Sequence, residues 1–113
     1  MRETPERGSI EKIHLAGQLE IRPMARAIRM HEKDNVATVL EDVAPGDAIS
    51  IEGGAGPLGI EAAEAVPFGH KIALSAIGKN KKIRKYGETI GIATRAIQAG
   101  THVHVHNLKS ARG

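Results

Sequence analysis

The stretch Ile72-Ala-Leu-Ser-Ala-Ile-Gly-Lys-Asn-Lys-Lys-Ile83 aligns without gaps, twenty residues later, with Ile92-Ala-Thr-Arg-Ala-Ile-Gln-Ala-Gly-Thr-His-Val103. Each copy is a short apolar run, a tight turn that carries Gly or Asn, and a second strand-like run. Residues 37–51 follow the same scheme with two additional residues. Strands this short, separated by turns, leave no room for the helical crossovers of a parallel sheet. The repeat therefore predicts a mainly β, compact, intertwined, barrel-like fold.

The segments outside this repeat supply further elements. Residues 24–30 are expected to form a strand with Ala25 and Ala27 on one face. Asp34 is expected to cap a short helix over residues 35–42, because the apolar residues there follow helical spacing. Further strands are expected at 48–51 and 60–66, with turns at 45–47 and 67–70. Gly87 is expected to take a positive φ in a hairpin turn.

Length and composition place the chain in a broad class. Its 113 residues suffice for one domain, and with one Phe, one Tyr and no Trp the core must be aliphatic. The polar residues 1–22 are expected to form an N-terminal arm, partly disordered or carrying an extra element, ahead of a domain at 23–110. The chain has no cysteine, which excludes a disulfide scaffold and suits a reducing cytoplasm. No apolar run is long enough to predict a membrane span or a signal peptide.

Five of the seven residues from Lys79 to Lys85 are basic. Such a run can steer a sugar acid, an acidic partner or a nucleic acid, or it can be a solvated turn and an edge strand protected by lysines. The formal net charge of only +3 and the presence of just two aromatic residues argue against nucleic-acid binding as the function.

Three of the six histidines lie in Gly100-Thr-His-Val-His-Val-His-Asn107. In a β-strand, His102, His104 and His106 share one face while Val103 and Val105 share the other. Neighbouring rings then stand roughly 6.6 Å apart and the outer pair roughly 13 Å. The pair His102 and His104 can therefore hold one metal ion or one anion, whereas all three on one ion is not expected. The alternative is the exposed polar face of an ordinary strand.

Two further histidines lie beside turns. His70 and Lys71 precede an apolar run, where a histidine can act as general base and a lysine can anchor a carboxylate. His31 follows the 24–30 strand and precedes Asp34. Each of these histidines can equally be structural or merely exposed, and Tyr86 and Asn107 can each simply satisfy backbone groups.

Several short sequence motifs, taken together and in order, resemble a known family, the SAF domain of altronate/galactarate dehydratases. The resemblance covers about residues 24–109 and implies the β-clip fold. The resemblance depends on the motifs Ile28-Arg-Met-His31, Asp34-Asn-Val-Ala37, Gly69-His-Lys-Ile-Ala-Leu74, Lys85-Tyr-Gly87, Ile90-Gly91 and Gly100-Thr-His-Val-His-Val-His-Asn107.

The resemblance implies a role as the small subunit of a two-part sugar-acid dehydratase, a hydro-lyase, or of the related sulfolactate sulfo-lyase. This chain would then complete a metal-assisted β-elimination site on a large catalytic subunit. The metal, iron or manganese, would be held mainly by that large subunit. Alone it would be inactive. Carried onto this sequence, catalytic roles fall to His31, His70 and His104, metal binding to His102 and His104, and substrate binding to Asp34, Asn35, Lys71, Lys85, Tyr86 and Asn107.

The alternative function is a non-catalytic module that binds a small ligand, a metal or a protein. In either case the expected partners are a large subunit and a sugar acid, with no membrane. A small β module that normally docks on a larger protein leaves apolar surface uncovered, which favours a homo-oligomer when the chain is isolated.

Overall fold

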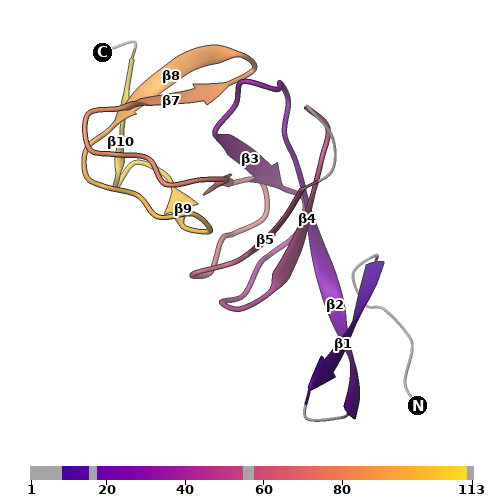
Figure 1. Cartoon of the computed structure of the whole chain (residues 1–113). Coiled ribbons are helices and arrows are strands. Elements are labelled where there is room, and N and C mark those ends of the chain that lie inside the picture. Colours follow the sequence, from indigo (N-terminus) through magenta and orange to yellow (C-terminus); the bar gives the residue numbers. More distant parts are fainter. Residues whose placement is uncertain (1–8, 16–17, 55–57, 112–113) are drawn as a thin grey trace.

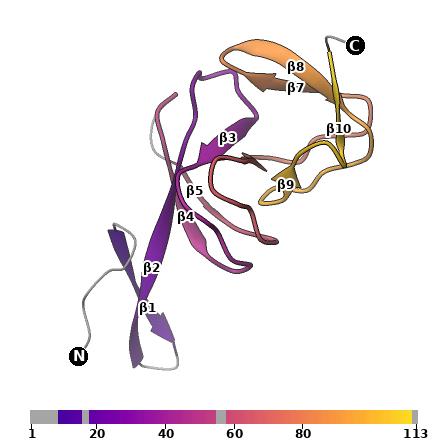
Figure 2. The ribbon, with the colours of Figure 1, turned by 180° about the vertical axis from the view of Figure 1, so that it is seen from behind.

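The computed structural model describes residues 9–15, 18–54, 58–111 and omits the rest, including the first eight residues of the predicted arm. Every regular element among the described residues is a strand (Figures 1 and 2). The strands are β1 Ser9–Leu15, β2 Gln18–Ile28, β3 Val36–Val39, β4 Ala48–Glu52, β5 Leu58–Glu61, β6 Lys71–Ala73, β7 Lys82–Lys85, β8 Glu88–Ala93, β9 His102–Val103 and β10 Leu108–Ser110. The predicted mainly β class is confirmed.

The strands form two sheets. The larger has the order β5-β4-β2-β3-β6-β9, with β1 added beside β2, and the smaller has the order β10-β8-β7. The β1–β2 hairpin extends away from the rest of the molecule (Figure 1). With the hairpin included, the molecule spans 52 × 23 × 20 Å. This hairpin is an extra element within the predicted arm, while the assignment of 1–22 and 23–110 as separate units stays a prediction.

One turn motif recurs four times along the chain. Each copy closes through a hydrogen bond from an N–H to the carbonyl three residues earlier, at Asp47, His70, Lys81 and Thr101. The copies pair through the isolated bridges Val43↔Val66 and Ile77↔Ile97. The predicted repeat is therefore a unit of the fold, and the sequence analysis had not recognised its copy at residues 60–72.

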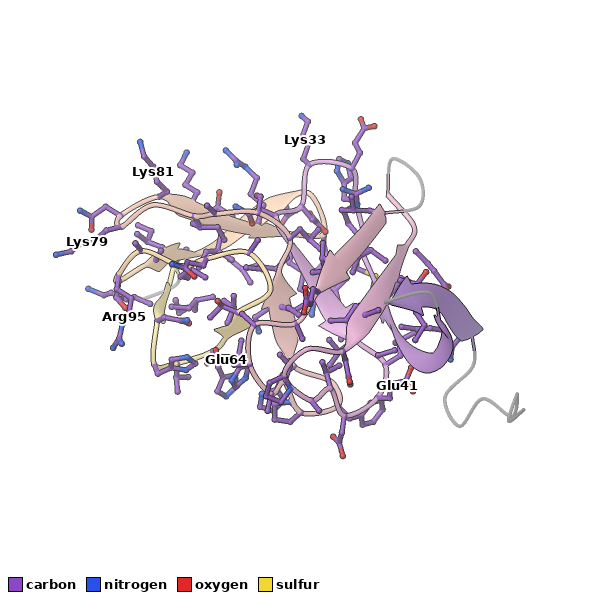
Figure 3. The ribbon with its side chains drawn as sticks, turned by 60° about the horizontal axis from the view of Figure 1, so that its bottom comes forward. Lys33, Glu41, Glu64, Lys79, Lys81 and Arg95 are labelled. Carbon is purple, nitrogen blue, oxygen red and sulfur yellow. The ribbon has the colours of Figure 1, made fainter. Side chains whose placement is uncertain are left out.

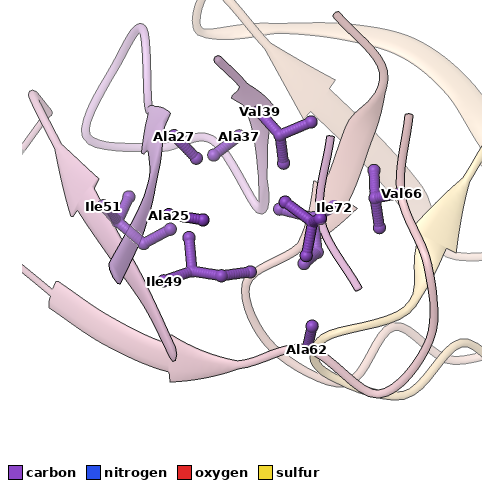
Figure 4. Close-up of a cluster of buried hydrophobic side chains, with 10 residues drawn as sticks. Ala25, Ala27, Ala37, Val39, Ile49, Ile51, Ala62, Val66 and Ile72 are labelled. Atoms are coloured by element: carbon purple, nitrogen blue, oxygen red, sulfur yellow. The ribbon is translucent and has the colours of Figure 1, made fainter. Parts of the chain in front are cut away.

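Each bridged pair of turns organises one aliphatic cluster. Val43 and Val66 belong to a cluster with Ile49, Ile51 and Ile72 (Figure 4), while Ile77 and Ile97 belong to a second one. The second cluster also contains Val36, Ala73, Ile83, Ala93 and Val103. The core is aliphatic, as composition predicted.

The predicted helix over residues 35–42 is wrong. Residues Val36–Val39 form strand β3, which pairs with β2 on one side and with β6 on the other. Val36, Ala37 and Val39 are all buried. A strand that is buried on both faces loses the two-residue alternation, so its apolar residues matched helical spacing by chance.

The other expected elements are largely confirmed. The strand predicted at 24–30 is the end of β2, which stops at Ile28 and buries Ala25 and Ala27 as expected. The strand predicted at 48–51 is β4, whereas the one predicted at 60–66 ends at Glu61. Gly87 has a φ of 75°, and Tyr86 before it has a φ of 61°. Two successive positive φ angles are typical of the tight turn that joins β7 to β8.

Lys79–Lys85 contains a turn followed by strand β7, which lies at the edge of the smaller sheet. Lysines on an edge strand discourage pairing with another chain. In the part of the chain that the structure describes, there is no helix that could cross a membrane.

Candidate functional site

Three imidazoles gather where β6 meets β9. These strands pair antiparallel, with Ile72 opposite His102, and continuing that register by two residues places His70 opposite His104. The rings of His70 and His104 stack with centroids 4.4 Å apart, and Nδ1 of His70 lies 2.9 Å from Nε2 of His102. One nitrogen from each of the three rings lies within 4.8 Å of the others. All three side chains are half-buried. We call these three residues the histidine cluster.

The predicted extended strand through residues 102–106 is wrong, although its histidines do converge. Strand β9 contains only His102 and Val103, and a turn follows in which the N–H of Asn107 donates to the carbonyl of His104 at 3.0 Å. Because the chain turns, the rings of His102 and His106 lie 5.2 Å apart rather than the roughly 13 Å expected for a strand. Val103 is buried whereas Val105 is 79% exposed, so the two do not share a face as predicted.

Asn107 fixes this turn from the inside. Its side chain is buried, accepts the N–H of His104 through Oδ1 and donates through Nδ2 to the carbonyl of His102, both at 2.9 Å. The amide thus holds the backbone of two members of the histidine cluster. Both contacts are those of a positioning residue.

Glu64 is a neighbour that the sequence analysis missed. Its Oε2 accepts the N–H of His102 at 2.9 Å. The turn at Gly100 brings the two together, because the carbonyl of Gly100 accepts the N–H of Ala63 at 2.8 Å. Only the unrecognised copy of the repeat, at 60–72, could have signalled this contact.

The surroundings favour the neutral forms of His102 and His104. Partial burial first, and then the nearby His70, His106 and His104, lower the pKa of His102, while Glu64 opposes this effect. The pKa of His104 is also lowered, by desolvation first and then by His70, Lys71 and His106. Neutral imidazoles are the form that binds metals and accepts protons.

Lys71 brings a positive charge to this site. Burial and, second, the charge of Lys85 lower the pKa of its ammonium group. Lys71 in turn lowers the pKa of His104, so His104, Lys71 and Lys85 form one electrostatic neighbourhood. Two lysines that repel each other gain from a bound anion, which favours a carboxylate ligand here.

Asp34 and Asn35, which were predicted to bind substrate, join the two sheets; their role toward a substrate stays a prediction. Asp34 is buried and accepts the N–H groups of Gly87, at 2.7 Å, and of Tyr86, at 2.9 Å. Asn35 accepts the N–H of Arg84 at 2.8 Å and donates to the carbonyl of Lys82 at 2.9 Å. The amide of Asn35 thus binds two backbone groups of β7, next to the point between Ile83 and Arg84 where the pairing of β7 with β8 changes register. We call Asp34 and Asn35 the carboxylate–amide latch.

His31 and Tyr86 lie beside this latch. The ring of His31 packs on Gly87, where an added Cβ would come within 2.9 Å of it, and its Nδ1 accepts the N–H of Lys33 at 3.0 Å. Tyr86 is 60% exposed, with Nζ of Lys85 5.1 Å from its ring centre. His31 therefore packs against the turn of the β7–β8 hairpin, while the exposed ring of Tyr86 is accessible to a ligand.

The residues of the histidine cluster fit a divalent metal. Imidazole suits zinc, iron and related ions, and three histidines with an open fourth position are a known catalytic arrangement. The metal pair predicted from sequence was His102 and His104, and the structure adds His70 to it. The cluster can otherwise exchange protons with a bound acid.

Most of the basic run lies elsewhere. Figure 3 shows Lys79 and Lys81 projecting from the upper left end of the molecule, whereas Glu64, whose Oε2 accepts the N–H of His102, lies at its lower edge. Lys81, Lys82 and Arg84 line a shallow groove there with Asn80 and Gly78. Only Lys85, at the end of the run, acts on Lys71 beside the histidine cluster.

The fold and site define a class of protein: a mainly β module built on a repeated tight turn, with a half-exposed imidazole cluster and an adjacent lysine. The family described as the altronate/galactarate dehydratase SAF domain matches residues 25–111. The chain belongs to this family.

Individual relatives agree with this assignment. The chain is similar to altronate dehydratase of Bacillus subtilis, at 40% identity over 87 residues, and to galactarate dehydratase (L-threo-forming) of Escherichia coli, at 40% over 88 residues. These matches cover 77% and 75% of this chain but only 17% and 16% of the two relatives. It is also similar to (2R)-sulfolactate sulfo-lyase subunit alpha of Paracoccus pantotrophus, at 43% over 47 residues, which are 42% of this chain and 70% of that relative.

Proposed function

We propose that this chain is the small subunit of a two-part lyase in the cytoplasm that removes water from a sugar acid, or sulfite from a sulfonated analogue. The observation that carries the proposal is the half-exposed histidine cluster beside Lys71. The relatives support the division of labour, because the module is about a sixth of the dehydratases and yet also resembles a protein named as a subunit. The larger part of the site would belong to a separate polypeptide.

The chemistry of such an elimination makes two demands. A proton must leave the carbon next to a carboxylate, and a hydroxide or sulfite must leave the following carbon. A bound divalent metal, iron or manganese, supplies stabilisation of the enediolate-like charge and polarises the leaving group. We assign Lys71, the nearby Lys85 and Tyr86, whose ring lies next to the Lys85 ammonium group, to binding the carboxylate of the substrate.

The histidine cluster would contribute according to its state. Free imidazoles at His70 and His104 transfer protons, whereas imidazoles that bind a metal orient and polarise the substrate through it. We assign His31, Asp34, Asn35 and Asn107 to holding the module together, in place of the catalytic and substrate-binding roles that the resemblance implied. Their backbone and packing contacts support this reassignment.

Purification of the complex from its native cell tests this proposal. We expect the chain to co-purify with a large subunit of the dehydratase type. The isolated chain should show negligible dehydration of altronate or galactarate and negligible release of sulfite from sulfolactate, and adding the large subunit should restore one of these activities. Full activity of the isolated chain would contradict the proposal. A stable complex without turnover on any of these acids would favour the non-catalytic binding module.

Substitution of Lys71 sharpens the test in the reconstituted complex. Removing a charged hydrogen-bond donor to a carboxylate costs about 1.5–3 kcal/mol, so Lys71→Met should raise KM by roughly 10–100-fold. Lys79→Met is the matched control, because Lys79 is exposed and projects from the left end of the molecule into solvent (Figure 3). Equal KM values for both variants would show that Lys71 does not bind the substrate.

A further inference from the structure

We propose that His70, His102 and His104 bind one divalent transition-metal ion of the zinc type on this chain alone, without ligands from another polypeptide. This goes beyond the expectation that a large subunit holds the metal. It depends on the proposed function only for the use of the metal, not for its binding.

The spacing of the nitrogens is the first support. Two ligand nitrogens on one metal with bonds of 2.0–2.1 Å are about 2.9–3.4 Å apart. Nδ1 of His70 and Nε2 of His102 are 2.9 Å apart, which is already within this range. The third nitrogen, from His104, lies within 4.8 Å of both. A side-chain rotation that moves it by roughly 1.5 Å completes a triangle of ligands around one ion.

The backbone holds these ligands before any metal arrives. His102 pairs with Ile72 in the β6–β9 ladder, and Glu64 accepts its N–H. Asn107 joins the carbonyl of His102 to the N–H of His104. His70 ends a turn, and its N–H donates to the carbonyl of Pro67 at 3.0 Å. A site whose ligands are already positioned loses little conformational entropy when the ion binds.

The donor set selects the class of metal. Three imidazole nitrogens with no carboxylate among them suit zinc, cobalt, nickel and ferrous iron, and disfavour magnesium and calcium, which prefer oxygen. The half-buried rings leave space for a water molecule or a substrate at a further position. The charge of Lys71 nearby favours an anionic ligand there, such as the carboxylate of a hydroxy acid.

A hydrogen bond between His70 and His102 is the competing explanation for the short contact. In that arrangement one ring donates its proton to the other, and the ring of His104 only stacks on its neighbours. The two explanations differ in what happens when His104 is removed. The metal site then loses a ligand, whereas the hydrogen-bonded pair stays intact.

Metal titration of the isolated chain, prepared without a polyhistidine tag and stripped with a chelator, tests the proposal. We expect calorimetry to show one equivalent of Zn²⁺ and no binding of Mg²⁺. Co²⁺ should give the visible bands of a low-coordinate nitrogen site, and X-ray absorption of the zinc form should show three imidazole nitrogens at about 2.0–2.1 Å. An absence of stoichiometric binding would overturn the proposal, and binding through fewer than three imidazoles would overturn the ligand set.

Single substitutions identify the ligands. His70→Ala, His102→Ala and His104→Ala should each weaken Zn²⁺ binding by at least about 100-fold, more than is typical for residues that only orient a ligand. His106→Ala is the matched control, because His106 lies next to His102 but outside the histidine cluster, and His31→Ala is a remote one. Equal losses in His106→Ala, or unchanged affinity in His104→Ala, would overturn the assignment. Circular dichroism checks that each substitution of these half-exposed side chains leaves the fold intact.

These outcomes separate the metal site from the proposed lyase. Zinc binding by a chain that never supports turnover would retain the metal site and reject the lyase. Turnover by a complex in which the three alanine variants bind metal as well as the parent chain would do the reverse.

Discussion

The histidine cluster and the carboxylate–amide latch are both built from polar side chains that the sequence marks out, yet they differ in where their hydrogen bonds go. Asp34 and Asn35 form their side-chain hydrogen bonds with backbone groups of Lys82, Arg84, Tyr86 and Gly87. The imidazoles of the histidine cluster instead face one another and remain half-exposed. Polar groups that satisfy buried backbone stabilise the fold, whereas polar groups left facing one another at the surface are available for ligands.

The largest effect on stability is expected at Asp34. Asp34→Ala leaves the N–H groups of Tyr86 and Gly87 without their charged acceptor, which should lower the free energy of unfolding by about 2–4 kcal/mol, measured with urea. Asp42→Ala is the matched control, since Asp42 is exposed and its Oδ1 accepts the N–H of Phe68 at 2.8 Å. If both variants lose the same amount, Asp34 has no special role in joining the sheets.

The hairpin turn beside the latch gives a second prediction. At Gly87, with a φ of 75°, a Cβ would also meet the ring of His31, so Gly87→Ala should destabilise by about 1–3 kcal/mol. Gly69→Ala is the control, because Gly69 has a φ of 85° but nothing within 4 Å of its added Cβ. The difference between the two variants isolates the contact, and combining Gly87→Ala with His31→Ala should remove it. A loss at Gly87 that His31→Ala does not relieve would contradict this account.

Asn107 connects the two kinds of region, because it satisfies the backbone and also positions ligands. Asn107→Ala should lower stability by about 1–3 kcal/mol, since the N–H of His104 and the carbonyl of His102 lose their partner. It should also weaken Zn²⁺ binding by about 10-fold. A purely structural role predicts the first effect without the second, as for Asp34→Ala, so calorimetry on the folded variants distinguishes the two.

The sequence predicted the repeat, the aliphatic core and most strands because turn residues and apolar runs are local signals. It failed at Val36–Val39, where pairing on both sides decided for a strand, and at His104–Asn107, where one buried amide turns the chain. The site was predicted in part for the same reason. His102 and His104 are neighbours in sequence, but His70 and Glu64 reach them only through the β6–β9 register and the turn at Gly100.

The smallest expected effect concerns protons in the metal-free chain. Burial and neighbouring imidazoles lower the pKa of His102 and of His104 from the ordinary value of 6.5. The unfolded chain therefore binds protons more readily than the folded one, so stability contributed by these two groups is present above about pH 6.5 and is lost as the pH falls below it. Magnetic-resonance titration should place both transitions below 6.5, and His70→Asn should raise them, because His70 contributes to both shifts. Unchanged pKa values of His102 and His104 in His70→Asn would contradict this account.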